Sequence, residues 1–166
     1  MAFIYLVFTS IRKYSDLLAL RSKLTEMESN IVSITRDYDP SLPEINIDHE
    51  LLVQAILNIS KNALQSLENN TEPKIEFKTR VERQFTISGK RHRFVIRVDI
   101  KDNGPGIPKE IQEHLFYPMI SKRVGGTGLG LTFAQSIVSQ HGGIIEFETE
   151  PGETIFKVFI PLENSI

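Results

Sequence analysis

Hydrophobic residues recur at helical spacing in three segments of the chain. The first, residues 11–28, places four apolar side chains three or four positions apart, with charged residues between them: Leu17, Leu20, Leu24 and Met27. This pattern predicts an amphipathic helix. A second helix is predicted over residues 48–67, with Asp48 placed to cap its first turn. A third is predicted over residues 129–140, where the glycines at 142–143 would end it.

The helix predicted over residues 48–67 has two distinct faces. One is apolar and should face the core, and its members are Leu52, Ile56, Ile59, Ala63 and Leu67. The other is strongly polar but uncharged, and its members are Gln54, Asn58, Asn62 and Gln65. Because residues three or four apart share one side of a helix, these amides indicate that this side faces something polar.

Alternating apolar and polar residues predict the strands. They fall at residues 31–37, 74–82, 94–100, 144–149 and 154–161. Ser88-Gly89-Lys90 predicts a hairpin turn between the second and third strands, and Pro151-Gly152 predicts a turn between the last two. Three helices against one mixed sheet give an α/β (α+β) fold, built as a two-layer sandwich.

Length and charge limit the classes of protein to consider. A chain of 166 residues fits one domain, and a net charge of -2 gives no electrostatic reason to expect nucleic acid as a partner. Without cysteine, the chain has neither a disulfide framework nor a Cys nucleophile. The apolar run at residues 2–8 is far shorter than the ~20 residues that a membrane span needs, so no membrane partner is expected. A cytoplasmic location agrees with these features.

Two glycine-rich clusters suggest a nucleotide pocket with a lid between them. The first contains Asp102, Gly104 and Gly106, and the second spans residues 125–131. Glycine lets the backbone turn sharply and approach a flat ligand, and a carboxylate at the end of a strand can accept a hydrogen bond from an adenine amine. Free N–H groups at the start of the following helix favour a polyphosphate. Each cluster alone would more simply be a tight turn.

Four motifs in a fixed order identify the family that the chain resembles. They are residues 58–63 (NISKNA), residues 102–106 (DNGPG), residues 116–118 (FYP) and residues 126–131 (GTGLGL). In this order they resemble the N box, first glycine box, F box and second glycine box of the ATP-binding domain of sensor histidine kinases, in the GHKL superfamily with its Bergerat fold. Residues 36–44, 115–119 and 125–127 are similar to nitrogen-regulation kinases of the NtrB type. The resemblance covers about residues 29–162; we therefore expect a catalytic domain at 29–166, preceded by an amphipathic helical lead-in at 1–28.

The resemblance implies a role for each matching residue. Asn62 would bind the Mg²⁺ ion that accompanies ATP, and Asn58 would support the same phosphate side. Asp102 would read the adenine amine above a floor made by Gly104 and Gly106, and Thr154 would lie near the base. The phosphate cradle would comprise Gly126, Thr127, Gly128, Leu129 and Gly130. Lys122 or Arg123 would contact the β- or γ-phosphate, unless both are solvated surface charges.

The resemblance also implies the type of reaction. Related gyrase, mismatch-repair and chaperone ATPases carry a water-activating Glu four residues before the Mg²⁺ Asn, where this chain has Asn58. An amide cannot take a proton at neutral pH, so phosphoryl transfer to a protein is favoured over hydrolysis. His49-Glu50 lacks the basic residue and proline of a phosphoacceptor motif, so the acceptor His is expected on a separate dimerisation domain.

The expected partners follow from that reaction. They are the dimerisation domain of the same kinase, a response regulator that receives the phosphoryl group on an Asp, and a PII-type signalling protein. Two alternatives stay open: a non-catalytic GHKL module that binds nucleotide or a partner protein, and a GHKL ATPase.

Overall fold

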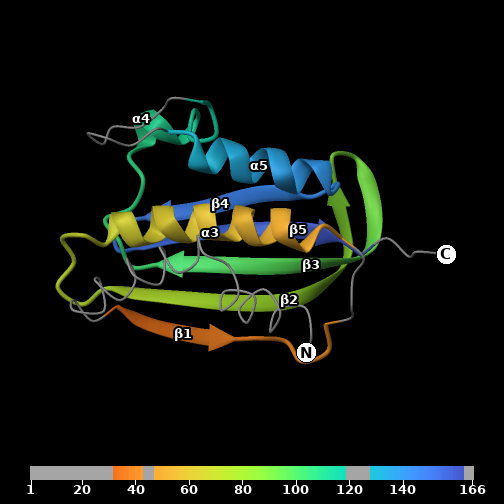
Figure 1. The fold of residues 1–166 in the computed structure, drawn as a ribbon, viewed down its shortest axis with the longest axis horizontal. Coiled ribbons are helices and arrows are strands. Elements are labelled where there is room, and N and C mark those ends of the chain that lie inside the picture. Colours follow the sequence, from red (N-terminus) through yellow and green to blue (C-terminus); the bar gives the residue numbers. More distant parts are fainter. Residues whose placement is uncertain (1–31, 43–46, 119–127, 163–166) are drawn as a thin grey trace.

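The described part of the chain forms a five-stranded sheet with helices packed against it. The computed structural model describes residues 32–42, 47–118 and 128–162. Their elements, in chain order, are β1 (Ser33–Asp37), α3 (His49–Ser66), β2 (Lys74–Ile87), β3 (Lys90–Asp102), α4 (Lys109–Gln112), α5 (Gly130–Gln140), β4 (Ile144–Glu150) and β5 (Glu153–Pro161) (Figure 1). The helix expected over residues 11–28 lies outside the described residues.

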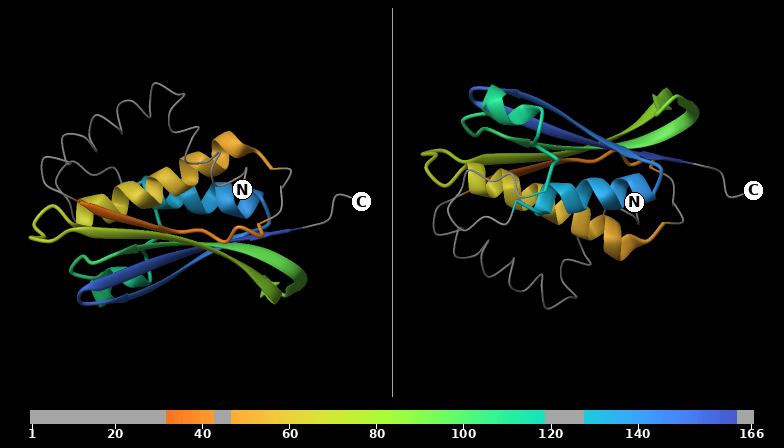
Figure 2. Two further views of the ribbon diagram at one scale, coloured as in Figure 1. Left: turned by 90° about the horizontal axis from the view of Figure 1, so that it is seen from below. Right: turned by 90° about the horizontal axis from the view of Figure 1, so that it is seen from above.

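The sheet is mixed, as expected. Its strand order is β1-β2-β3-β5-β4, in which β1 runs parallel to β2 and every other neighbouring pair is antiparallel. Figure 2 shows α3 and α5 side by side on one face of the twisted sheet. The predicted two-layer sandwich is therefore confirmed.

The core lies between α3, α5 and the inner face of the sheet. The side chain of Asp48 accepts a hydrogen bond from the Leu51 N–H and caps α3, as predicted. All five residues of the predicted apolar face are buried: Leu52, Ile56, Ile59, Ala63 and Leu67. They pack against alternate residues of the strands, including Ile96, Val98, Ile100, Phe156 and Val158. On α5, Ala134, Ile137 and Val138 are buried, and Leu131 is partly buried against the same core.

The hairpin of β2 and β3 is longer than the sequence pattern predicted. Its strands continue to Ile87 and begin again at Lys90, so Ser88 and Gly89 form a two-residue turn. Both turn residues have positive φ, the geometry that suits a tight hairpin. Lys90 therefore belongs to β3 rather than to the turn. The strands were predicted too short because polar residues interrupt the alternation near the tip.

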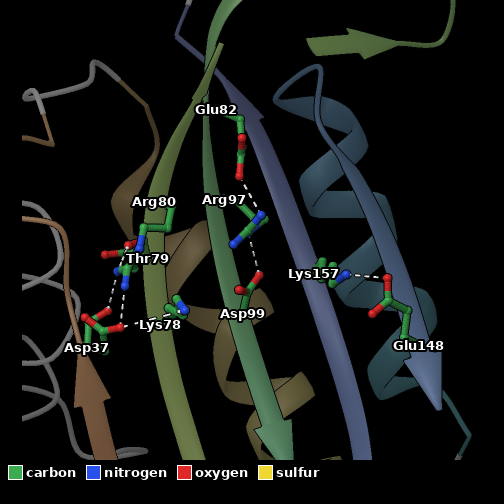
Figure 3. A network of polar contacts seen from close by, with 9 residues as sticks. All are labelled: Asp37, Lys78, Thr79, Arg80, Glu82, Arg97, Asp99, Glu148 and Lys157. Atoms are coloured by element: carbon green, nitrogen blue, oxygen red, sulfur yellow. Dashed lines mark hydrogen bonds and ion pairs between the residues drawn. The ribbon is translucent and has the colours of Figure 1, made fainter. Parts of the chain in front are cut away.

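Charged residues at alternate positions of the strands lie on the outer face of the sheet (Figure 3). Arg97 contacts both Glu82 and Asp99 on the strands, with its Nε 3.0 Å from Asp99 Oδ1. Burial raises the pKa of Asp99, and the neighbouring Arg97 and Lys157 oppose that rise. The oppositely charged side chains of this face therefore pair with one another.

None of the helices in the described ranges is long and apolar enough to cross a membrane.

Candidate functional site

The carboxylate of Asp102 is buried where β3 ends. It is 2% exposed, and its Oδ1 accepts hydrogen bonds from the Gly104 N–H and the Ser66 hydroxyl, each at 2.9 Å. Burying a charge is costly unless donors compensate it. The end of α3 and the first glycine cluster provide such donors, so this carboxylate has a fixed place and direction.

Gly104 sits too close to this carboxylate to tolerate a side chain. A Cβ at Gly104 would lie 2.6 Å from both Asp102 Oδ1 and Ser66 Oγ. Gly106 has φ +83°, and a Cβ there would lie 2.7 Å from the carbonyl oxygen of Glu150. The two glycines therefore let the loop lie close over Asp102 and against the β4–β5 turn, which a residue with a side chain would prevent.

Thr154 is the cross-strand neighbour of Asp102, because β5 pairs with β3 in that register. It is buried, and its hydroxyl lies 3.0 Å from the hydroxyl of Thr149 on β4. Thr149 Oγ1 also accepts a hydrogen bond from the Ile107 N–H at 2.9 Å. A row of hydroxyls thus joins the Asp102 corner to the backbone that leaves the glycine loop.

The amide side of α3 faces the start of α5. Asn58 and Asn62 are partly buried, whereas Gln54 and Gln65 are exposed. A Cβ at Gly130 would lie 3.9 Å from Asn58 Cβ, so the end of the second glycine cluster meets α3 at this amide. The polar side of the helix therefore continues from Asn58 through Asn62 to Ser66, rather than to Gln65.

The segment after the first glycine cluster packs against the rest of the domain as far as it is described. Phe116 contacts Phe147 edge-on, with ring centroids 6.1 Å apart. The Thr132 hydroxyl of α5 donates to the Phe116 carbonyl oxygen at 3.0 Å. The short helix α4 lies within this segment, for which the sequence predicts a lid.

Several predicted site residues lie outside the described residues. These are Lys122, Arg123, Gly126 and Thr127. Of the rest of the second cluster, Gly128 has φ +64° and Leu129 is exposed just before α5. Three histidines lie in the described ranges with a defined place: His92 is buried on β3, the His114 ring lies tilted against Tyr117, and His141 ends α5 with its Nδ1 2.8 Å from the Ile137 carbonyl oxygen.

Sequence reasoning missed three residues that shape this site. Ser66 could have been found because it lies four residues after Asn62, on the same side of the helix. The sequence around Thr149 does not indicate a role in the site, because its contacts depend on the register of β4 and β5. Asn103 ties the loop back to the sheet: its side-chain Oδ1 accepts from the Lys74 N–H at 2.7 Å, and its carbonyl oxygen accepts from Asn70 Nδ2 at 2.8 Å.

A nucleotide-binding fold of a known class accounts for this arrangement. Residues 47–164 match the family described as "Histidine kinase-, DNA gyrase B-, and HSP90-like ATPase", and the chain belongs to that family. Membership implies that the chain binds ATP. Two features of the site agree with such a ligand. The carboxylate of Asp102 is buried at a strand end, and Gly104 and Gly106 lie where any side chain would clash with neighbouring atoms.

Two of the relatives are sensory histidine kinase/phosphatases named NtrB. The chain is 50% identical over 141 residues to the sensory histidine kinase/phosphatase NtrB of Vibrio alginolyticus, covering 84% of this chain and 40% of that protein. It is 49% identical over 143 residues to NtrB of Klebsiella oxytoca, covering 86% and 41%. The chain thus spans about two fifths of the length of these relatives.

Solved structures show the same fold. The catalytic domain of histidine kinase ThkA superposes with a TM-score of 0.68 at 24% identity, covering 96% of this chain and 90% of that one. The mycobacterial sensor histidine kinase MprB gives a TM-score of 0.65 at 20% identity, covering 84% and 89%.

Proposed function

We propose that the chain is the ATP-binding catalytic domain of a two-component sensor histidine kinase of the nitrogen-regulation type. It binds ATP with Mg²⁺ and transfers the γ-phosphoryl group to a histidine on a separate dimerisation domain. A response regulator of the nitrogen type then receives the group on an Asp in the cytoplasm, and a PII-type protein regulates the kinase. The partners follow from the likeness to NtrB over 84% of the chain.

The observation that carries this proposal is the continuity of one polar helix side. Gly130 meets α3 at Asn58, and Ser66, two turns further along, contacts Asp102. At a rise of 1.5 Å per residue, these two contacts are about 12 Å apart along the helix axis. The adenine and phosphate ends of one nucleotide can therefore be held by the same helix, with Asn62 between them.

Asn62 is the proposed Mg²⁺ ligand. Within the described ranges, no group of three or more His, Asp or Glu side chains is placed to hold a metal. The ion would then depend on the Asn62 amide oxygen, phosphate oxygens and water, a ligand set that Mg²⁺ accepts. Gly128, Leu129 and Gly130 would complete the phosphate side with Gly126 and Thr127, and Lys122 or Arg123 would contact the β- or γ-phosphate.

Transfer rather than hydrolysis is supported by Asn58. Its amide cannot act as a general base, so an attacking water would lack activation. A histidine imidazole on an acceptor domain is already a nucleophile at neutral pH. The domain then needs only to position the nucleotide and stabilise charge.

One experiment separates the proposal from its alternatives. The chain is mixed with a purified phosphoacceptor domain of an NtrB-type kinase and ATP labelled at the γ-position. Label on the acceptor histidine supports the kinase, and its absence from an acceptor His→Gln variant is the matched control. Free phosphate alone would instead indicate an ATPase, and nucleotide retention without either product would indicate a binding module.

A further inference from the structure

Ser66 ends α3 with its hydroxyl directed at the buried acid of the site. Its Oγ lies 2.9 Å from Asp102 Oδ1 and 2.7 Å from the carbonyl oxygen of Ala63. A serine hydroxyl carries one proton, so these two acceptors compete for it. A carboxylate is the stronger acceptor, and the bond to Asp102 is therefore the one that the charged site favours.

Two donors meet on one oxygen of Asp102. Ser66 Oγ and the Gly104 N–H both approach Oδ1, from a helix and from a loop respectively. Fixing one oxygen of a carboxylate from two sides also fixes the plane of the group and hence the direction of Oδ2. A base-reading acid needs this orientation, because a hydrogen bond weakens steeply when it is misaligned.

We propose that Ser66 is a positioning residue that aligns the Asp102 carboxylate with the 6-amino group of the adenine base and so sets the preference for adenine. This inference rests on the proposed binding of ATP at the site. Donation by Ser66 keeps Oδ1 engaged, so the carboxylate meets the ligand as an acceptor in one direction. A purine with a carbonyl at position 6 presents another acceptor there and is disfavoured.

A purely structural role for Ser66 makes a different prediction. In that case the hydroxyl would mainly donate to the Ala63 carbonyl oxygen at the end of the helix. The Leu67 N–H, four residues after Ala63, does not bond to that oxygen, because it bonds to the Leu64 carbonyl oxygen. Loss of that bond would lower the stability of the domain and affect every nucleotide alike. Ser60 offers a matched control, because its hydroxyl donates to the Ile56 carbonyl oxygen at 2.8 Å on the same helix.

The test compares two ligands that differ in the 6-amino group. Dissociation constants of ATP and of purine riboside triphosphate, which lacks that group, are measured in Mg²⁺ for the wild-type chain, Ser66→Ala and Ser60→Ala. Thermal unfolding of each protein is recorded alongside. Because a bond to a charged group contributes only a few kcal/mol at most, Ser66→Ala should weaken ATP binding about five- to tenfold. Binding of purine riboside triphosphate should change less than about twofold, and Ser60→Ala should change neither.

The outcomes separate this inference from the proposed function. If the wild-type chain binds ATP but Ser66→Ala leaves its affinity unchanged, or weakens both ligands equally, Ser66 does not act through the amino group and the inference is overturned. If the wild-type chain binds neither nucleotide, the proposed function itself fails. A loss confined to ATP supports both.

Discussion

Replacing Gly104 by Ala tests how closely the glycine loop is fitted to the buried acid. The added Cβ would lie 2.6 Å from Asp102 Oδ1, 2.6 Å from Ser66 Oγ and 3.1 Å from Ser66 Cβ. The two oxygens end their side chains, but they are hydrogen-bonded to each other, and Oδ1 also accepts from the Gly104 N–H. The loop or the carboxylate must therefore move, and the Gly104 N–H bond to Oδ1 would be stretched or lost.

The expected effect has two parts. Forcing a methyl group into a packed region costs roughly 1–3 kcal/mol of stability. Displacing the carboxylate should weaken its proposed bond to the adenine amine, and a hydrogen bond to a charged group is worth about 1.5–3 kcal/mol. Since 1.4 kcal/mol is tenfold in affinity, ATP should bind roughly ten- to a hundredfold more weakly.

Both parts can be measured on the purified chain. Calorimetric titration with a non-hydrolysable ATP analogue in Mg²⁺ gives the affinity, and urea unfolding gives the stability. Gly89→Ala is the matched control: Gly89 has φ +81° at the hairpin tip, with nothing within 4 Å of an added Cβ. That substitution should cost about 1–2 kcal/mol of stability through backbone strain alone and leave the ATP affinity unchanged.

Wild-type affinity in Gly104→Ala would refute the dependence of ATP binding on the close fit of loop and acid. Equal affinity losses in Gly104→Ala and Gly89→Ala would show that the effect is general destabilisation, and the assignment of this loop to the base would then lose its support.

Three further predictions concern the metal, a titrating tyrosine and a helix cap. Asn62→Ala should weaken ATP-analogue binding in Mg²⁺ more than in EDTA, and equal losses in calorimetric titrations would remove the ligand role. Burial raises the pKa of Tyr38 to about 12 from an ordinary 10.0. The folded state therefore keeps the phenol proton longer than the unfolded state, and the resulting contribution to the unfolding free energy is complete below pH 10 and lost as pH rises toward 12. Tyr38→Phe should flatten the alkaline decline of the free energy of unfolding in urea. An identical decline in the variant would contradict this prediction. Asp48→Ala removes the bond to the Leu51 N–H and should lower the free energy of unfolding by about 1 kcal/mol without changing the ATP affinity. An unchanged free energy of unfolding would show that this cap does not stabilise α3.

The elements of the fold could be predicted where the hydrophobic pattern is strong. The apolar face of α3 and the inward residues of α5 follow a helical period, and Ile96, Val98 and Ile100 alternate along β3. The pattern failed at the tip of the β2–β3 hairpin. There Gln84 has φ 55°, and the side chains of Phe85 and Ile87 pack with Val95 and Phe159 in a second cluster, so simple alternation breaks down.

The candidate site was only partly predictable for a different reason. Asp102, Gly104 and Gly106 could be named because they are neighbours in sequence and their chemistry is local. Ser66 contacts Asp102 across 36 positions of the chain. Thr149 reaches Ile107 across 42 positions. Such contacts depend on strand register and helix placement, which the sequence pattern does not specify.

Asp102 lies where the inner face of the sheet changes from apolar to polar. Strand register aligns one row of residues across four strands: Ile75, Asp102, Thr154 and Thr149. The next row toward the middle of the sheet is wholly apolar: Phe77, Ile100, Phe156 and Phe147. A shift of one residue in β3 would expose Ile100 and turn Asp102 to the outer face. Burial of the apolar row opposes that shift, so the hydrophobic core also fixes the position of Asp102. The register that buries Ile100 is therefore the same register that places Asp102 on the inner face.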